Sequence, residues 1–368
     1  MGHESLSERD WASIIERLGG AQALTQSAFE TRAFRRARGI STAVILLRVL
    51  LAYCLGNRGL RSTAAWAAAV DLADVSNVAV LYRLRISGDW LAHLVGVALA
   101  EGMPKAAAGR PIRILDGTTV PKAGGAGNRN ALWRIHAAFD VASERFAAFE
   151  LTDQSGGERL DRIAVTKGEI RLADRCFLQP DRIAAVIDQG ADVVIRAGWK
   201  SARWQTADGA NFDLVAALED ASKTATPDRI DRPIHVGRKG GAALALRLVA
   251  QRKPPEACEA ARRTARREAQ RGGHTLSQAT SIAADWVIIV TSLRPDATTS
   301  DDILALYRLR WRIELAFKRL KSLIGLKGPP GTDERSARPY LLAHLLLILL
   351  LEPFVDRFED SPHWAYVA

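Results

Sequence analysis

One acidic residue, Glu314, stands in a short basic and aromatic stretch, YRLRWRIELAFKRLK, at residues 307–321. On a helix with about 100° per residue, Glu314 shares one face with two aromatic rings and three cations, beside an apolar stripe. These neighbours are Tyr307, Arg310, Trp311, Lys318 and Lys321. A solvated helix with Glu–Arg and Glu–Lys pairs would explain this pattern. A metal-binding carboxylate, among side chains that hold a nucleic acid, would explain it as well.

Two further acids, Asp116 and Asp174, each end a predicted strand, in ILDGTTV and RLADRCF. Acids at the ends of adjacent strands project into one crevice, and a helix packed across that end can add a third. We therefore expect Asp116, Asp174 and Glu314 to converge, although they lie far apart in the sequence. A single acid after a strand is more often a turn or cap residue. The competing acids in similar positions are Asp140, Asp188 and Asp192.

Three carboxylates held together repel one another unless a cation neutralises them. Hard oxygen ligands favour Mg²⁺ or, as its substitute, Mn²⁺ over zinc. Two such ions about 4 Å apart activate a water or 3′-hydroxyl and stabilise the leaving oxygen of a phosphodiester displacement. We therefore expect a two-metal site, in which Arg310 and Lys321 clamp phosphates, Tyr307 donates a hydrogen bond and Trp311 stacks on a base.

Residues 1–106 carry a helical pattern and are predicted to form an N-terminal helical DNA-binding domain. Within it, STAAWAAAVDLADVSNVAVLYRLR predicts two short helices, the second capped by Asp74 or Ser76. This pattern indicates a helix-turn-helix unit in which Arg83 and Arg85 contact DNA, or else an ordinary helical hairpin.

From residue 110 the hydrophobic period changes to that of strands. Residues 110–196 predict the order βββαβαβ, with one helix at Leu160–Lys167. This is the order of a ribonuclease-H-like α/β core. Residues 286–351 would complete the core with a buried strand and a helix, capped by Thr299 or Ser300, that carries Glu314. Residues 352–368 are expected to be a tail.

Residues 197–285 have a different composition and predict a β-rich insertion with a very basic helix, EACEAARRTARREAQR. A DNA-facing surface and a solvated helix explain this helix equally well. Its candidate DNA contacts are Arg262, Arg263 and Arg266.

The overall charge favours a polyanionic partner, nucleic acid before membrane. The 368 residues contain 51 Lys and Arg against 41 Asp and Glu, a net charge of +10. Three scattered cysteines indicate neither a disulfide framework nor a zinc site. The apolar run Leu341–Leu351 is shorter than the roughly 20 residues of a membrane span and predicts a buried core helix. We expect a cytoplasmic protein that associates with the nucleoid through DNA and has no membrane partner.

The ordered motifs resemble those of the IS4-type DDE transposases of bacterial insertion sequences. Tyr307, Arg310, Glu314 and Lys321 match the Y-x2-R-x3-E-x6-K signature of that family without a gap. DGTT at residues 116–119 is similar to its first acidic motif, and ADRCF at residues 173–177 is similar to its second. The resemblance spans residues 110–326.

This resemblance implies a retroviral-integrase-like core, with Asp116, Asp174 and Glu314 as catalytic metal ligands. It implies Mg²⁺-dependent cleavage at the ends of the element and joining of the 3′-OH to target DNA, by a homodimer assembled on paired ends. Trp286 would stack on a flipped base, unless it is an aromatic residue of a core strand. The alternative functions are sequence-specific DNA binding without catalysis, and a nuclease without strand transfer.

Overall fold

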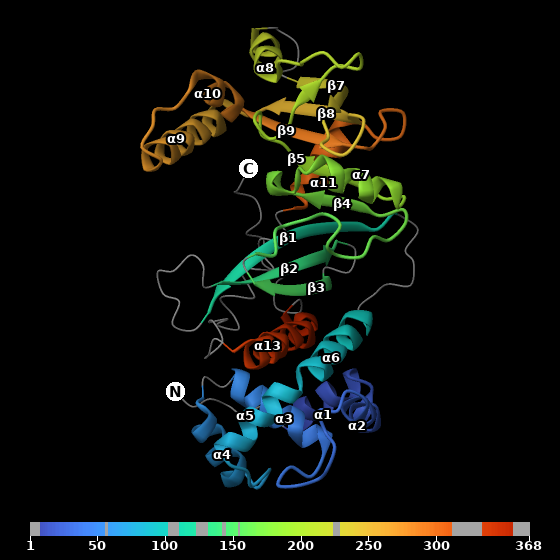
Figure 1. Ribbon diagram of the computed structural model, residues 1–368, viewed down its shortest axis with the longest axis vertical. Helices are drawn as coiled ribbons and strands as arrows, with labels where there is room; N and C mark the ends of the chain where they lie inside the picture. Colours follow the sequence, from blue (N-terminus) through green and yellow to red (C-terminus); the bar gives the residue numbers. More distant parts are fainter. Residues whose placement is uncertain are drawn as a thin grey trace.

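The strands lie in one mixed sheet in the computed structural model of the protein (Figure 1). The structure describes residues 8–55, 58–101, 110–122, 132–141, 145–153, 155–223, 229–310 and 333–355. Within these residues the strand order is β3-β2-β1-β4-β5-β9-β8-β7-β6. The strands are β1 (Ile112–Pro121), β2 (Leu132–Asp140), β3 (Arg145–Asp153), β4 (Ile170–Ala173), β5 (Asp192–Arg196), β6 (Trp204–Gln205), β7 (Arg229–Val236), β8 (Leu244–Arg252) and β9 (Trp286–Thr291).

The first five strands form the half of the sheet that carries the predicted acids. β1 pairs antiparallel with β2 and parallel with β4, β2 pairs antiparallel with β3, and β4 pairs parallel with β5. The crossover from β4 to β5 contains a 3₁₀ turn, η1 (Arg175–Phe177), and α7 (Pro180–Asp188). The mixed α/β class is confirmed, and this half of the sheet is consistent with the expected ribonuclease-H-like core.

The helix predicted at Leu160–Lys167 is wrong, because no residue of that segment is helical. The reason lies in Arg171 of β4, whose side chain is buried. Its guanidinium donates to the main-chain oxygens of Leu160, Ile163 and Ala164. Carbonyl groups that turn toward one guanidinium cannot all point along a helix axis. The segment is therefore a loop wrapped around Arg171.

The predicted insertion extends the same sheet instead of forming a separate one. β9 begins at Trp286, as predicted, and pairs antiparallel with both β5 and β8. β7 and β6 then continue the sheet outward. The helices of this part are α8 (Leu214–Lys223), α9 (Pro255–Arg271) and α10 (Gln278–Ala284). In Figure 1, α9 and α10 project to one side of this end of the molecule.

Six of the described helices form the opposite end of the molecule (Figure 1). They are α1 (Glu8–Arg17), α2 (Gly20–Glu30), α3 (Ala43–Leu55), α4 (Leu60–Ala69), α5 (Asn77–Ile86) and α6 (Gly88–Glu101). Of the two predicted caps of α5, Ser76 is the one present, because its hydroxyl accepts a hydrogen bond from the main-chain nitrogen of Ala79 at 3.2 Å. The predicted pair of short helices is therefore present as α4 and α5.

Two hydrophobic cores cover the two faces of the sheet. One contains Ile114, Leu172 and Val194 together with residues of the N-terminal helices and of α13 (Glu334–Val355). α13 contacts α3, α5, α6 and β3, and it lies between the N-terminal helices and the strands in Figure 1. The N-terminal helices and this face of the sheet therefore share one core. The other core contains residues of α7 and α8.

The two C-terminal helices of the described chain follow the predictions in part, because the first starts at a predicted cap but ends at Arg308, six residues before Glu314, which it was expected to carry. α11 (Ser300–Arg308) is capped by Thr299, whose hydroxyl accepts from the main-chain nitrogen of Asp302 at 3.2 Å. The apolar run predicted to be a core helix lies in α13, where Leu341, Leu345 and Leu349 are at most 4% exposed. Among the described residues, none of the helices combines the length and the apolar character needed to cross a membrane.

Candidate active site

Asp116 and Asp174 lie at matching positions of two neighbouring parallel strands. β1 and β4 pair in the register Ile112↔Ile170 and Ile114↔Leu172. Continuing that register by two residues from the last pair brings Asp116 beside Asp174, just past the end of β4. Both side chains are half-buried. The structure thus brings together two of the three predicted acids.

Each of these carboxylates accepts a hydrogen bond from the next residue along the chain. Asp116 Oδ1 accepts from the main-chain nitrogen of Gly117 at 2.8 Å, and Asp174 Oδ1 accepts from that of Arg175 at 2.7 Å. Asp174 also caps η1, so the cap role considered for a single acid after a strand is present. These bonds orient both carboxylates before any ligand arrives.

Both acids face the core that contains α11 and α13. Side chains alternate between the faces of a strand, and Ile114 and Leu172 belong to that core. Asp116 and Asp174 follow them at a spacing of two residues, on the same face. Arg196, two residues after Val194 of β5, is also on this face. The acids therefore point toward the side of the sheet from which α11 approaches.

Tyr307 of α11 lies close enough to Asp174 for the two side chains to interact electrostatically. Burial raises the pKa of its phenol, the positive charges of Arg310 and Arg196 lower it, and the negative charge of Asp174 raises it. The guanidinium carbon of Arg310 lies 6.0 Å from the centre of the Tyr307 ring. Two residues of the basic helical stretch therefore reach the same place as the pair of aspartates.

The competing acids lie elsewhere. Asp140 is 5% exposed and lies opposite Arg113 in the ladder of β1 and β2, near the start of β1. Asp192 pairs with Ile170 at the start of β4, and its carboxylate accepts from Ser292 at 2.6 Å. Asp188 is an exposed residue at the end of α7. None of the three lies at the end of the strands where Asp116 meets Asp174.

Glu158 is a further acid at this place, and the sequence did not single it out. Its carboxylate lies over Gly117, where an added Cβ atom would stand 2.7 Å from Oε1 of Glu158. Partial burial raises the pKa of the Cys176 thiol, and the charges of Glu158, Asp174 and Asp116 raise it further. All three carboxylates therefore lie near the Cys176 thiol, with Glu158 on the face of β1 opposite the Asp116 side chain. A glycine leaves room for such an approach, but nothing in the sequence indicated that Glu158 would fill it.

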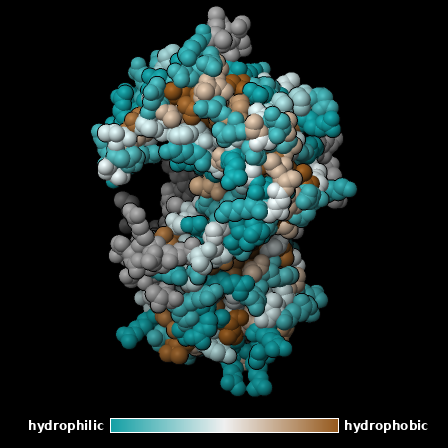
Figure 2. Space-filling view, turned by 45° about the horizontal axis from the view of Figure 1, so that its top comes forward, coloured by the Kyte–Doolittle hydropathy of each residue, from teal (hydrophilic) through white to brown (hydrophobic). Residues whose placement is uncertain are grey.

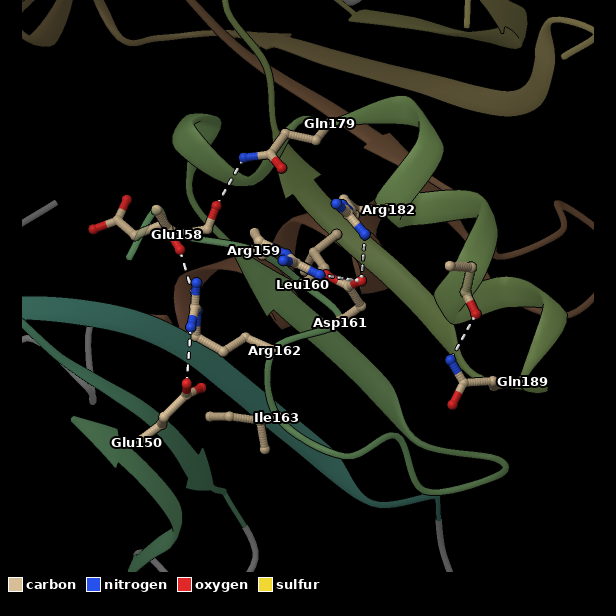
Figure 3. A network of polar contacts seen from close by, with 12 residues as sticks. Glu150, Glu158, Arg159, Leu160, Asp161, Arg162, Ile163, Gln179, Arg182 and Gln189 are labelled. Atoms are coloured by element: carbon tan, nitrogen blue, oxygen red, sulfur yellow. Dashed lines mark hydrogen bonds and ion pairs between the residues drawn. The ribbon is translucent and has the colours of Figure 1, made fainter. Parts of the chain in front are cut away.

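A polar network holds the loop that carries Glu158 (Figure 3). Gln179 donates to the main-chain oxygen of Glu158 at 2.7 Å. On either side of this contact, Arg162 pairs with Glu150, and Asp161 pairs with Arg159 and Arg182. Together with the buried Arg171, these contacts fix the loop against β3, β4 and α7.

The described carboxylate oxygens of this site are compatible with binding a hard divalent cation. Carboxylate oxygens are the ligands that Mg²⁺ and Mn²⁺ prefer, and the two aspartates are already oriented. The described part of the chain contains no group of three or more His, Cys, Asp or Glu side chains able to hold a metal ion. Glu314, the predicted third ligand, lies outside the described residues.

Two arginines predicted to contact DNA have partners within the protein. Arg83 donates to the main-chain oxygens of Ala33 and Arg36, both at 3.4 Å. Arg85 pairs with Asp333 at 2.7 Å, next to the start of α13. Both arginines therefore help to hold α5 in place, and their contact with DNA stays a prediction.

Two more residues predicted to contact DNA also have contacts within the protein. Trp286 is 2% exposed and belongs to the core beneath α7 and α8. Its burial favours the alternative of a core strand aromatic over base stacking. Arg262 donates to Asp285 at 2.7 Å, and Asp285 is itself buried. By contrast, Arg263 and Arg266 are exposed on α9, and neither forms an ion pair with a described residue.

The comparisons with known proteins agree with this geometry. Residues 107–350 match the family model described as "Transposase DDE domain". The chain is 36% identical over 365 residues to the putative transposase InsL for insertion sequence element IS186A of Escherichia coli strain K12, covering 97% of this chain and 96% of the relative. It is 36% identical over 366 residues to the transposase for insertion sequence element IS421 of Escherichia coli, with the same coverage. This chain belongs to the DDE transposase family. The resemblance to the IS4-type members is thereby confirmed.

In this transposase the family match runs from just before β1 through most of α13. It includes both aspartates, Glu158 and the insertion. The remaining predicted site residues of the transposase, Trp311, Glu314, Lys318 and Lys321, lie outside the described residues.

Proposed function

We propose that this transposase cuts DNA at the ends of its element and joins the resulting 3′-OH to target DNA, in a reaction that depends on Mg²⁺ or Mn²⁺. The pair of oriented carboxylates at matching positions of β1 and β4 supports this most strongly. Tyr307 and Arg310 beside that pair provide groups that bind phosphate. The insertion-sequence names of the relatives support DNA ends as the substrate.

Asp116, Asp174 and Glu314 are the proposed metal ligands of a two-metal site. Bound cations of this kind activate the attacking hydroxyl and stabilise charge on the leaving oxygen. The protein contributes orientation. The bonds from Gly117 and Arg175 hold Asp116 and Asp174 in fixed positions, so that little reorganisation is needed when a ligand binds.

Tyr307 and Arg310 are the proposed contacts of the phosphate next to the cleaved bond. A phenol donates a hydrogen bond and a guanidinium donates charge-assisted ones. Trp311, Lys318 and Lys321 are proposed to extend this contact along the terminal nucleotides, as the family signature implies. On α9, Arg263 and Arg266 are proposed to hold DNA farther from the acids. We propose that a homodimer acts on paired ends.

The test is cleavage of duplex DNA that carries the element's own ends, in Mg²⁺, Mn²⁺ or EDTA. Asp116→Asn, Asp174→Asn and Glu314→Gln should each lower cleavage at least about a hundredfold. Asp188→Asn, an exposed acid of the same core, should leave it unchanged. Intact cleavage by Glu314→Gln would refute the assignment of that ligand. Cleavage without joining would identify a nuclease, and selective binding without nicking would identify a non-catalytic DNA-binding protein.

A metal-binding measurement separates the ligand assignment from activity. Mn²⁺ should raise the thermal midpoint of the wild-type protein, because a ligand that binds only the folded state stabilises it. The same addition should shift Asp116→Asn less and Asp188→Asn as much as the wild type.

A further inference from the structure

The outward face of α5 carries two large apolar side chains that nothing in the described structure covers. Val78 is 69% exposed and Tyr82 is 60% exposed. They lie four residues apart, so they stand one above the other on the helix. Val80 and Leu84, on the inward face, are buried against the rest of the N-terminal helices. In Figure 2, patches of hydrophobic surface, coloured brown, lie at the lower end of the molecule, where the N-terminal helices are.

An arginine-rich loop flanks the same helix. Arg35, Arg36 and Arg38 lie between α2 and α3, and all three are exposed. Among the described residues, none of them pairs with an acid, whereas most described arginines of the core do. The loop thus presents three uncompensated positive charges. Hydrophilic side chains, coloured teal, project from this end of the molecule in Figure 2.

The loop is attached to α5 along its length. Arg83 of α5 donates to two main-chain oxygens of the loop, and its guanidinium lies 5.8 Å from the centre of the Phe34 ring. At the other end of the loop, Gly39 has a φ of +47°, and an added Cβ atom would lie 2.6 Å from the main-chain oxygen of Asp74. Only glycine permits this approach without strain. The arginines are therefore held at a fixed position beside the exposed face of α5.

We propose that α5 enters the major groove of the DNA at the ends of the element, with Val78 and Tyr82 against the base edges and Arg35, Arg36 and Arg38 on the adjacent phosphates. This inference rests on the proposed function and names the surface that would recognise its substrate. An α-helix fits the major groove, where apolar side chains contact thymine methyl groups, and flanking cations bind the backbone. The three uncompensated arginines favour DNA over a second copy of this basic chain as the occupant.

The experiment measures binding of the full chain in EDTA, so that cleavage plays no part. One labelled duplex carries the element's own terminal sequence, and a second carries the same bases in scrambled order. Val78→Ser/Tyr82→Ala should lower affinity for the terminal duplex roughly tenfold or more and leave affinity for the scrambled duplex unchanged. Because both side chains are exposed, the thermal midpoint should not move.

The arginine variant should behave differently. Arg35→Gln/Arg36→Gln/Arg38→Gln should weaken binding to both duplexes. The slope of log affinity against log salt should become shallower by about 0.9 for each phosphate that the variant no longer neutralises. Arg294→Gln is the matched control, because Arg294 is also an exposed arginine but lies on the loop after β9, in the sheet half of the molecule. It should change neither the affinity for the two duplexes nor the salt slope.

Three results would overturn the proposal. They are an unchanged preference for the terminal duplex in Val78→Ser/Tyr82→Ala, no preference in the wild type, and loss of self-association with intact DNA binding in that variant. The last result would identify the face as a contact between copies of the chain. Selective binding by a wild type that never cleaves would refute the proposed catalysis and leave this recognition surface standing.

Discussion

The carboxylate of Glu158 lies over Gly117, on the face of β1 opposite the Asp116 side chain. A third acid thus approaches the end of β4 through the space that glycine leaves open. Its charge acts on the Cys176 thiol together with the charges of Asp174 and Asp116.

Gly117→Ala should lower the cleavage rate and leave the free energy of unfolding nearly unchanged. The added methyl group would meet the flexible end of Glu158, which can rotate away, so the free energy of unfolding should change by about 1 kcal/mol or less. The shift in charge beside the aspartates should lower the cleavage rate by about tenfold to a hundredfold, measured on DNA ends at saturating Mg²⁺. Glu158→Ala should show a similar decrease. Normal cleavage by Glu158→Ala would mean that this acid only fills space.

Arg171→Met should destabilise the protein strongly, because it leaves the buried Glu169 without its main partner. Both side chains are at most 1% exposed, and Nε of Arg171 lies 2.6 Å from Oε1 of Glu169. Removing one member of a buried pair costs about 3–5 kcal/mol of unfolding free energy. Urea denaturation would measure it, with the exposed Arg294→Met as a control expected within about 0.5 kcal/mol. In Glu169→Gln/Arg171→Met the destabilisation should be smaller than the sum of the two single effects.

His136 should make stability depend on pH. Its ring is 3% exposed, and burial, with the nearby Arg162 and Arg134, lowers its pKa from 6.5 to about 4. The unfolded chain takes up this proton near pH 6.5 and the folded protein only near pH 4. The stability present above pH 6.5 is therefore lost as pH falls through that window, by at most about 3 kcal/mol. In His136→Gln, unfolding free energy against pH should be flatter between these values, whereas the exposed His274→Gln should keep the wild-type slope.

The arginines of α9 should separate into two classes. Arg263→Gln/Arg266→Gln should make the salt dependence of DNA binding shallower, by about 0.9 in slope for every phosphate left without its cation, at unchanged thermal stability. Arg262→Gln should keep that slope and lower stability by about 1–3 kcal/mol, because it leaves the buried Asp285 carboxylate without its partner. Equal salt slopes in all variants would show that α9 does not contact DNA.

The sequence predicted those features that depend on local signals. Strand period and end residues located β1 and β4 with their acids, and the parallel pairing of these strands then brings Asp116 beside Asp174. The caps at Ser76 and Thr299 were predictable because a cap requires only a side chain and a main-chain nitrogen three residues on.

Features that depend on distant partners were not predictable. The loop at residues 158–169 is held by the guanidinium of Arg171 from the following strand. Its helical sequence pattern therefore led to a wrong prediction. Arg83 and Arg85 have the sequence pattern of surface cations, but their partners come from residues 33–36 and from Asp333. The position of Glu158 depends on Gln179 and on the open space at Gly117 of β1.

The core shared by the N-terminal helices, α13 and one face of the sheet has a mechanical consequence. A DNA segment gripped by α5 would be separated from the two aspartates by packed protein, and not by a flexible tether. The dimensions of the fold would then set the number of base pairs between the recognised sequence and the cut bond. Insertions in the spacer of an end should therefore abolish cutting while leaving recognition intact.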